Sequence, residues 1–511
     1  MANILIRDIT GTDRIYSTSQ VAFRDADNIG ETVTFYEDGG GGGGGDIESL
    51  IKRTLNAYSD SSVTYIGDYA FAHCFSLSMV DCSSVESIGH AAFYQCSGLI
   101  SANFPECISI SNSAFYGCSS LVSVNFPECT ILGSTVFYMC SRLTSAYFPK
   151  ISRIENYTFS NCTVLNYICA PNCEYIGMSA FTGCKSLTEA HFSKCTSLGA
   201  YAFAICYSLA SANFSVLSSI PSSAFNNLSW LTTAIFPSAT YIGSGAFMNC
   251  SRLTTVNVEN CSKIEQSAFA YCKFASISIP NCEWISSNAF NVNPNLSFID
   301  APKCSYIGHA AFWSCANLVS AYFSSCTSVT GTETFRYCSK LTDIRMPLLS
   351  SIVRYMFVGC SSLSYVEFAS CKSVEQYAFT VLSRLVSVSL PLCETLSGCV
   401  FQRCTNLPSI YLPNCKIIGS SAFYSCYSLS TASFPMCTTI SNFAFYQCSK
   451  LVSLYLLGSS VPTLQNSSAF YATPLTGTGS GIIYVLPSMV DAFKAANNWS
   501  IFSSHIVAYS E

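Results

Sequence analysis

Residues 121–143 read LVSVNFPECTILGSTVFYMCSRL, and nearly everything after about residue 65 repeats this stretch. A phenylalanine, usually in an Ala-Phe pair, marks each copy, and 15 of the 18 intervals between successive markers are 22 residues long. The marker phenylalanines are Phe71, Phe93, Phe115, Phe137, Phe159, Phe181, Phe203, Phe225, Phe247, Phe269, Phe290, Phe312, Phe335, Phe357, Phe379, Phe401, Phe423, Phe445 and Phe470. A period this regular predicts a solenoid, in which each copy packs on its neighbours.

One half of each copy predicts a short strand. Val124 and Phe126 would share one face, because side chains alternate along a strand. Pro127 follows at once, and its lack of an N–H suits the end of a strand. Together with Leu121 and Cys129, these residues match the leucine-rich repeat pattern.

The other half predicts a short helix, because Ala114, Phe115, Cys118 and Leu121 would lie on one helical face. Ile-Gly pairs such as Ile88-Gly89 precede this segment, and the glycine would allow a tight entry that a Cβ would oppose. We therefore expect an α/β solenoid: a leucine-rich-repeat arc of about 18–19 repeats of 22 residues, each a strand plus a short helix, with strands on the inner wall. A parallel β-helix is the main rival, but its shorter rungs and Gly/Asp signatures are missing.

The repeat, roughly Ile-Gly-x-x-Ala-Phe-x-x-Cys-x-x-Leu-x-x-Val-x-Phe-Pro, resembles that of BspA-like leucine-rich repeat proteins over about residues 65–460. The resemblance implies the fold and a habit of surface binding or adhesion. It does not imply a particular ligand.

The chain divides into five parts by pattern. Residues 1–38 carry no marker and predict a small β-rich attachment module without a secretory signal. Residues 39–45 are seven glycines, which predict a flexible linker. Residues 46–68 predict a capping helix begun by Asp46 and a lead-in, residues 69–460 the repeats, and residues 461–511 a C-terminal cap. Within that cap we expect a strand at 482–486, a helix at 487–498, and a seal made by Trp499, Phe502 and Ile506.

Composition excludes several classes of partner. Hydrophobic residues make up 50% of the chain, charged residues only 10%, and the net charge is −5. Without a basic face, docking on nucleic acid or anionic lipid is not expected. No apolar run approaches the ~18 residues that span a bilayer, so we expect no membrane insertion. No motif indicates a cofactor.

The thirty cysteines follow the repeat. Fifteen stand three residues after a marker, as in Cys96 and Cys118, and twelve occupy the slot of Cys107 and Cys129. Stacked copies would turn each set into a column of parallel side chains, a geometry that does not readily give the close, angled approach of a disulfide. We expect free, buried thiols acting as small hydrophobes rather than a disulfide network or a metal site.

Residues that alternate with the buried strand positions would form the variable inner face. Tyrosine, serine and asparagine dominate it, a composition typical of binding surfaces. One candidate cluster is Tyr147, Tyr167, Glu189 and His191, and a second, wider one is Phe298, Asp300, Tyr322, Asp343, Arg345, Tyr365 and Glu367, with Tyr411 further along. The alternative is that these neighbours merely stabilise cross-strand pairing.

Catalysis finds little support, because Glu189 and His191 lack an accompanying nucleophile or a pocket-forming insertion. We therefore expect a non-enzymatic protein whose inner face recognises a cell-surface glycan or protein. The expected setting is a bacteriophage virion or another extracellular surface, with residues 1–38 docking on the particle. The alternatives are a bacterial or protist surface adhesin and an intracellular scaffold for partner proteins.

Free thiols can be counted directly. Alkylation of the denatured, unreduced chain should add close to thirty adducts by mass spectrometry, one for each cysteine. A mass showing mostly bridged pairs would contradict the free-thiol interpretation.

Overall fold

The computed structural model describes residues 3–7, 13–17, 22–24, 32–34 and 55–510. It divides into two compact units, Met1–Ala239 with Gly245–Asn257, and Thr240–Ser244 with Val258–Glu511. The predicted glycine linker and the helix expected from Asp46 lie outside the described residues.

Among the described residues, four short strands precede the repeats. β1 (Asn3–Arg7) pairs with β2 (Asp13–Ser17), and β3 (Ala22–Arg24) pairs with β4 (Thr32–Thr34), both antiparallel. The pairing changes to parallel once the repeats begin.

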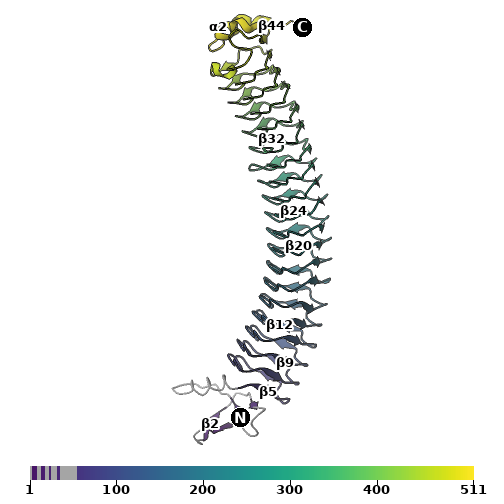
Figure 1. Ribbon diagram of the computed structural model, residues 1–511. Coiled ribbons are helices and arrows are strands. Elements are labelled where there is room, and N and C mark those ends of the chain that lie inside the picture. The colour runs from purple at the N-terminus through teal and green to yellow at the C-terminus, as the bar shows by residue number, and fades with distance from the viewer. Residues whose placement is uncertain (1–2, 8–12, 18–21, 25–31, 35–54, 511) are drawn as a thin grey trace. The chain divides into compact units, whose positions relative to one another are not determined.

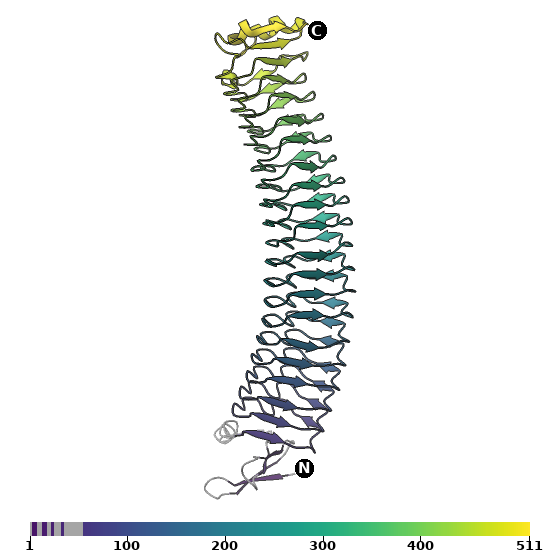
Figure 2. The same ribbon diagram turned by 45° about the vertical axis from the view of Figure 1, so that its right-hand side comes forward.

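Each repeat is one coil made of a three-residue strand, a two-residue strand and a segment of consecutive turns. In the coil quoted above, the strands are β11 (Ser123–Asn125) and β12 (Ile131–Leu132). Each strand pairs in parallel with its equivalent one copy away, as Ser123 does with Ser145. Figure 1 and Figure 2 show the coils stacked within each unit, with equivalent strands side by side. The predicted solenoid of parallel strands is confirmed.

The remaining strands keep the same order. The three-residue strands of the first unit are β5 (Ala57–Ser59), β7 (Met79–Asp81), β9 (Ser101–Asn103), β11, β13 (Ser145–Tyr147), β15 (Tyr167–Cys169), β17 (Glu189–His191), β19 (Ser211–Asn213), β21 (Thr233–Ile235) and β23 (Thr255–Asn257). Its two-residue strands are β6 (Tyr65–Ile66), β8 (Ser87–Ile88), β10 (Ser109–Ile110), β12, β14 (Arg153–Ile154), β16 (Tyr175–Ile176), β18 (Ser197–Leu198) and β20 (Ser219–Ile220).

The second unit repeats this arrangement. Its longer strands are β25 (Ser276–Ser278), β27 (Phe298–Asp300), β29 (Ser320–Tyr322), β31 (Asp343–Arg345), β33 (Tyr365–Glu367), β35 (Ser387–Ser389), β37 (Ser409–Tyr411), β39 (Thr431–Ser433) and β41 (Ser453–Leu456). Its two-residue strands are β22 (Tyr241–Ile242), β24 (Lys263–Ile264), β26 (Trp284–Ile285), β28 (Tyr306–Ile307), β30 (Ser328–Val329), β32 (Ser351–Ile352), β34 (Ser373–Val374), β36 (Thr395–Leu396), β38 (Ile417–Ile418), β40 (Thr439–Ile440) and β42 (Thr463–Leu464).

The marker phenylalanines form the centre of each unit. Every marker ring is fully buried. Neighbouring rings stack nearly parallel, with centroids 5.0 Å apart for Phe71 and Phe93 and 5.5 Å apart for Phe445 and Phe470. Ring pairs of this kind add about 0.5–1.5 kcal/mol each to the stability from burial alone. Val124 and Phe126 are buried as well, which confirms the face predicted for the strand.

The predicted short helix is wrong. The segment around each marker is a series of turns, because alternate backbone N–H groups bond to the next coil and those between them bond to the third residue back, as Ala72 does to Tyr69. The N–H groups of Tyr69, Phe71 and His73 donate to the carbonyls of His90, Ala92 and Tyr94. Ala114, Phe115, Cys118 and Leu121 are all buried, as the helical spacing suggested. Burial at those spacings therefore does not distinguish a helix from this turn.

Two positions in most coils adopt positive φ, two residues before and two residues after the marker. In the coil of Phe71 they are Tyr69, at φ 56°, and His73, at φ 63°. Left-handed backbone breaks an α-helix and costs most L-residues energy. Val381 accepts this conformation, at φ 62°, although it is β-branched.

The glycine of the Ile-Gly pair is required in some coils by close approach. A Cβ on Gly89 would lie 2.7 Å from the backbone nitrogen of Asp68 in the preceding coil. This confirms the tight entry expected at that position. Gly67 has open space instead, with no neighbouring atom nearer than 4.0 Å.

The thirty cysteines all lie in the part of the chain that the structure describes, where none takes part in a disulfide, and all but Cys169 and Cys399 are buried. Burial raises the pKa of Cys107 to about 12, so this thiol stays protonated at neutral pH. In most coils the cysteine after the marker also donates a hydrogen bond, as Cys118 does: its Sγ lies 3.1 Å from the carbonyl oxygen of Phe93. These cysteines are therefore more than apolar fillers, because they satisfy buried carbonyls of the preceding coil.

Asn293 occupies this cysteine slot in one coil and makes the same bond. Its Nδ2 donates to the carbonyl oxygen of Phe269 at 2.8 Å. The residue in this slot therefore donates a hydrogen bond in that coil as well. In two other coils the same slot holds an apolar residue, Leu228 or Leu382.

The C-terminal segment comprises η1 (Ser467–Phe470), β43 (Ile482–Val485), η2 (Pro487–Met489), α2 (Val490–Ala495), η3 (Ser500–His505) and β44 (Ile506–Ala508). The helix expected at 487–498 is thus shorter and begins as a 3₁₀ turn. Phe493 is buried on it, and Trp499, Phe502 and Ile506 are buried beyond it.

The residues with positive φ lead to a prediction about the free energy of unfolding. Val381→Asn should raise the free energy of unfolding by roughly 0.5–1 kcal/mol, because asparagine tolerates positive φ better than valine. The equivalent positions Asn227 and Asn249 already hold asparagine. Thermal unfolding followed by circular dichroism measures the shift. Val386→Asn is the control, since Val386 is similarly exposed but has ordinary φ, and an equal gain there would contradict the argument.

Candidate binding face

The three-residue strands expose one side of every coil. In most of them the central residue is buried while the first and third face solvent, as in β11, where Val124 is buried between exposed Ser123 and Asn125. We call the surface made by these first and third residues the strand face. All twelve candidate residues lie on it: Tyr147, Tyr167, Glu189, His191, Phe298, Asp300, Tyr322, Asp343, Arg345, Tyr365, Glu367 and Tyr411.

The first predicted cluster divides into two pairs. Tyr147 and Tyr167 lie on β13 and β15, which pair in parallel. A hydrogen bond with Cys169 and, more weakly, the neighbouring Tyr147 raise the pKa of Tyr167. Glu189 and His191 lie on β17, which belongs to the next sheet.

The Glu189 and His191 side chains approach each other at the solvent surface. His191 Nε2 is 3.3 Å from Glu189 Oε2, and 53% and 67% of the two side chains are exposed. An acid–base pair that does chemistry is usually shielded from water, so this geometry favours a surface contact.

The second predicted cluster centres on Tyr322 of β29. Its hydroxyl donates to Asp343 Oδ2 at 2.6 Å, and the Arg345 guanidinium lies over its ring with Cζ 4.5 Å from the centroid. Phe298 meets the same ring edge-on, with centroids 5.5 Å apart. The strands β27, β29 and β31 that carry these residues are paired in one sheet. We call Phe298, Tyr322, Asp343 and Arg345 the Tyr322 cluster.

Hydrogen bonds within the Tyr322 cluster shift the pKa of its carboxyl group. Partial burial would raise the pKa of Asp343, but hydrogen bonds from Tyr322 and Arg345 outweigh that effect and lower it. Arg345 Nη2 lies 3.1 Å from Asp343 Oδ2. Both charges therefore persist at neutral pH, and the side chains are held in place before any ligand arrives.

The remaining candidates lie outside this cluster. Tyr365 donates to Glu367 Oε2 at 2.6 Å on β33, which lies in a separate sheet from β31. Asp300 is half-buried and faces Tyr322 in register. Tyr411, at the end of β37, is 62% exposed.

Sequence reasoning missed a group of tyrosines near the C-terminus. Tyr455 of β41 stacks on Tyr484 of β43 with centroids 4.7 Å apart, and Tyr509 meets Tyr455 edge-on. The sequence held part of the signal, because Tyr484 lies inside the predicted final strand, but only the structure shows that it pairs in register with Tyr455.

The described residues contain no group of three or more His, Cys, Asp or Glu side chains placed to hold a metal ion. Among the same residues, no helix has both the length and the apolar character needed to cross a bilayer. What the strand face can do chemically is bind, through aromatic rings and fixed charges.

A stack of in-register coils with a variable exposed strand face defines a leucine-rich-repeat solenoid. The chain belongs to the family described as BspA type leucine rich repeat region, which matches residues 55–166, 152–274, 262–386 and 372–478. None of the comparisons indicates an enzyme family.

Solved structures resemble the chain at low identity. A leucine-rich repeat protein from Bacteroides ovatus is 20% identical, with a TM-score of 0.39, over 79% of this chain and 88% of that one. A leucine rich cell surface protein from Faecalibacterium prausnitzii is 20% identical, with a TM-score of 0.33, over 82% and 96%. The pneumococcal vaccine antigen PcpA is 15% identical, with a TM-score of 0.33, over 76% and 83%. No curated protein matches the chain.

The Tyr322 hydrogen bond makes a pH prediction. The carboxyl of Asp343 has a lowered pKa in the folded state, so its stabilisation is present above the unfolded-state pKa of about 3.9 and is lost as pH falls through the folded value. Tyr322→Phe removes one donor and should move the pKa of Asp343 upward, as an NMR titration of the carboxyl would show. An unchanged pKa would mean that Arg345 alone sets it.

Proposed function

We propose that this chain is a non-enzymatic binding and adhesion protein that recognises a cell-surface glycan or protein through the strand face. The observation that carries the proposal is the Tyr322 cluster. It presents an aromatic ring, a cation and a carboxylate at the surface of a paired sheet, all oriented by bonds within the protein.

Prior orientation favours binding. Binding costs conformational entropy when the side chains of the site must be ordered by the ligand. Side chains that are already fixed before binding reduce that cost. Tyrosine and arginine are also the residue types that most often dominate binding energy at protein surfaces. Intramolecular bonds alone could stabilise the sheet, but 65% of the Arg345 side chain remains exposed and available to a partner.

The setting we propose is a bacteriophage virion, with residues 1–38 docking on the particle and the repeats reaching a bacterial surface. Its support is the order of the sequence, in which a segment without markers is followed by seven glycines and then by the repeats. Membership of the BspA type family supports a cell-surface role more generally, since proteins of this type are cell-surface proteins. A bacterial or protist adhesin would share that role without the particle.

Binding of labelled protein to whole bacterial cells and to an array of bacterial surface glycans tests the proposal. Tyr322→Ala should weaken binding about tenfold or more, because it removes the ring that Phe298 and Arg345 contact. Deletion of residues 1–38 should leave cell binding intact and abolish association with phage particles.

Tyr427→Ala is the control, because it removes an exposed tyrosine that lies outside the three-residue strands and hence away from the strand face. Equal binding by the wild-type and Tyr322→Ala proteins would exclude the Tyr322 cluster as the binding site. A chain that ignores cells and glycans but captures cytosolic proteins would instead indicate a scaffold.

A further inference from the structure

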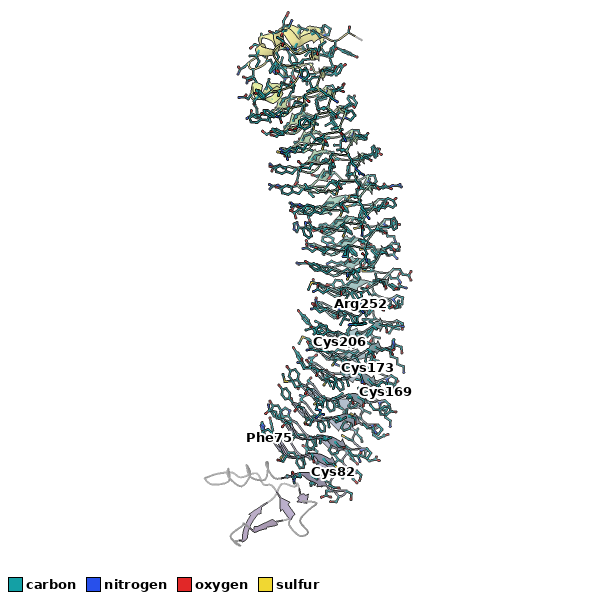
Figure 3. All side chains as sticks on the ribbon, viewed as in Figure 1. Phe75, Cys82, Cys169, Cys173, Cys206 and Arg252 are labelled. Carbon is teal, nitrogen blue, oxygen red and sulfur yellow. The ribbon has the colours of Figure 1, made fainter. Side chains whose placement is uncertain are left out.

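An open groove of ≈620 Å³ lies on the turn side of the first unit, away from the strand face. Its lining comes from positions one to four residues after the markers of five successive coils: Phe75, Gln95, Ser97, Tyr116, Gly117, Ser119, Met139, Ser141, Asn161 and Thr163. Figure 3 shows Phe75 at one margin of the coils and Cys169, on the strand face, toward the opposite margin. Within the first unit, the groove is therefore a separate surface from the Tyr147 and Tyr167 pair.

The chemistry of the lining is neutral. None of the ten lining residues carries a charged side chain, and seven of them have a side chain that ends in a hydroxyl or an amide. Phe75 adds an aromatic ring that is 49% exposed, and Met139 is 47% exposed. A ligand here would need hydroxyl groups to match the polar atoms and apolar C–H faces to match the exposed ring. Phosphate and carboxylate ligands would find no partner of opposite charge in the lining.

Backbone N–H groups that border the groove already donate hydrogen bonds within the protein. The N–H groups of Gln95, Gly117 and Met139 donate to carbonyls of the next coil at 2.6, 2.8 and 2.9 Å. A bound peptide gains most of its affinity in sheet-like recognition from free main-chain groups. These N–H groups are not free, so recognition must come from side chains.

The side chains repeat at a fixed interval. Ser97, Ser119, Ser141 and Thr163 occupy one position in four consecutive coils and form a row of hydroxyls along the stack. The coils are spaced by 5.0 Å at Phe93 and Phe115 and by 5.4 Å at Phe115 and Phe137. That interval is comparable to the length of one sugar residue in an extended glycan chain.

The hydroxyls keep capacity for a ligand. Thr163 Oγ1 donates to the carbonyl oxygen of Ser141 at 3.1 Å, which fixes its direction. A hydroxyl that donates one bond still has lone pairs to accept from another hydroxyl. The row can therefore accept hydrogen bonds from a chain that presents one hydroxyl per step.

We propose that this groove binds a linear, uncharged polysaccharide running along the stack, one sugar per coil, at a site independent of the strand face.

Gly117 gives a test that leaves the backbone in place. It lines the groove at φ 70°, the left-handed position at which other coils carry Asn227 and Asn249. Gly117→Asn therefore introduces a side chain into the groove in a conformation that asparagine tolerates, while Gln95 Cγ, 3.3 Å from the new Cβ, can move aside.

Isothermal titration calorimetry on the full chain should use three neutral linear hexasaccharides, cellohexaose, mannohexaose and chitohexaose, with hexagalacturonate as the charged comparison. We expect at least one neutral chain to bind, Gly117→Asn to weaken it tenfold or more, and Phe75→Ala to weaken it severalfold. Val381→Asn places the same residue at the same coil position outside the groove and should leave binding unchanged.

Thermal unfolding confirms that each variant is folded, and Phe75→Ala carries the test if Gly117→Asn unfolds. Tyr322→Ala should leave hexasaccharide binding unchanged, which separates this proposal from the proposed function. Absence of binding by all three neutral chains, preference for hexagalacturonate, or full affinity in both groove variants would overturn the proposal.

Discussion

The structure depends on hydrogen bonds made from one coil to the next by backbone that is neither helix nor regular strand. Around each marker, alternate N–H groups donate to the following coil, as Phe71 does to Ala92 at 2.7 Å. The marker rings stack beneath these bonds and exclude water from them. Buried backbone groups must be paired, so ring stacking and turn pairing require each other. Each coil is therefore joined to the next on the turn side as well as along its strands.

The solenoid could be predicted from the sequence because its signals are local and repeated. The 22-residue spacing of the markers and the alternation of Val124 and Phe126 were sufficient for the parallel strands and their buried side. The turn segment could not be predicted from the same kind of evidence. Ala114, Phe115, Cys118 and Leu121 repeat at helical spacing whether the chain forms a helix or a chain of turns. The discriminating feature is positive φ, which the sequence reveals only where a glycine, such as Gly117 or Gly359, or an asparagine occupies the position.

The candidate face was predictable in outline and not in detail. Alternation along the strands placed all twelve residues on the exposed side, but the partner of each side chain depends on sheet boundaries that no motif marks. Tyr322 therefore gathers Phe298, Asp343 and Arg345, whereas Glu189 and His191 are separated from Tyr147 and Tyr167 by a break between sheets. The cysteine columns were correctly placed in the interior. Their role as donors became clear only from the carbonyl oxygens they face and from Asn293, which makes the same bond.

In-register pairing has an evolutionary consequence. Because residues pair with their equivalents one coil away, as Ser123 pairs with Ser145, removal or duplication of one whole coil restores every bond at the junction. Unequal recombination between gene segments that encode neighbouring coils would then change the length of the protein by whole coils and keep the pairing pattern. A lineage could extend or shorten its reach toward a surface in single genetic steps, while the exposed residues of each added coil diversify afterwards.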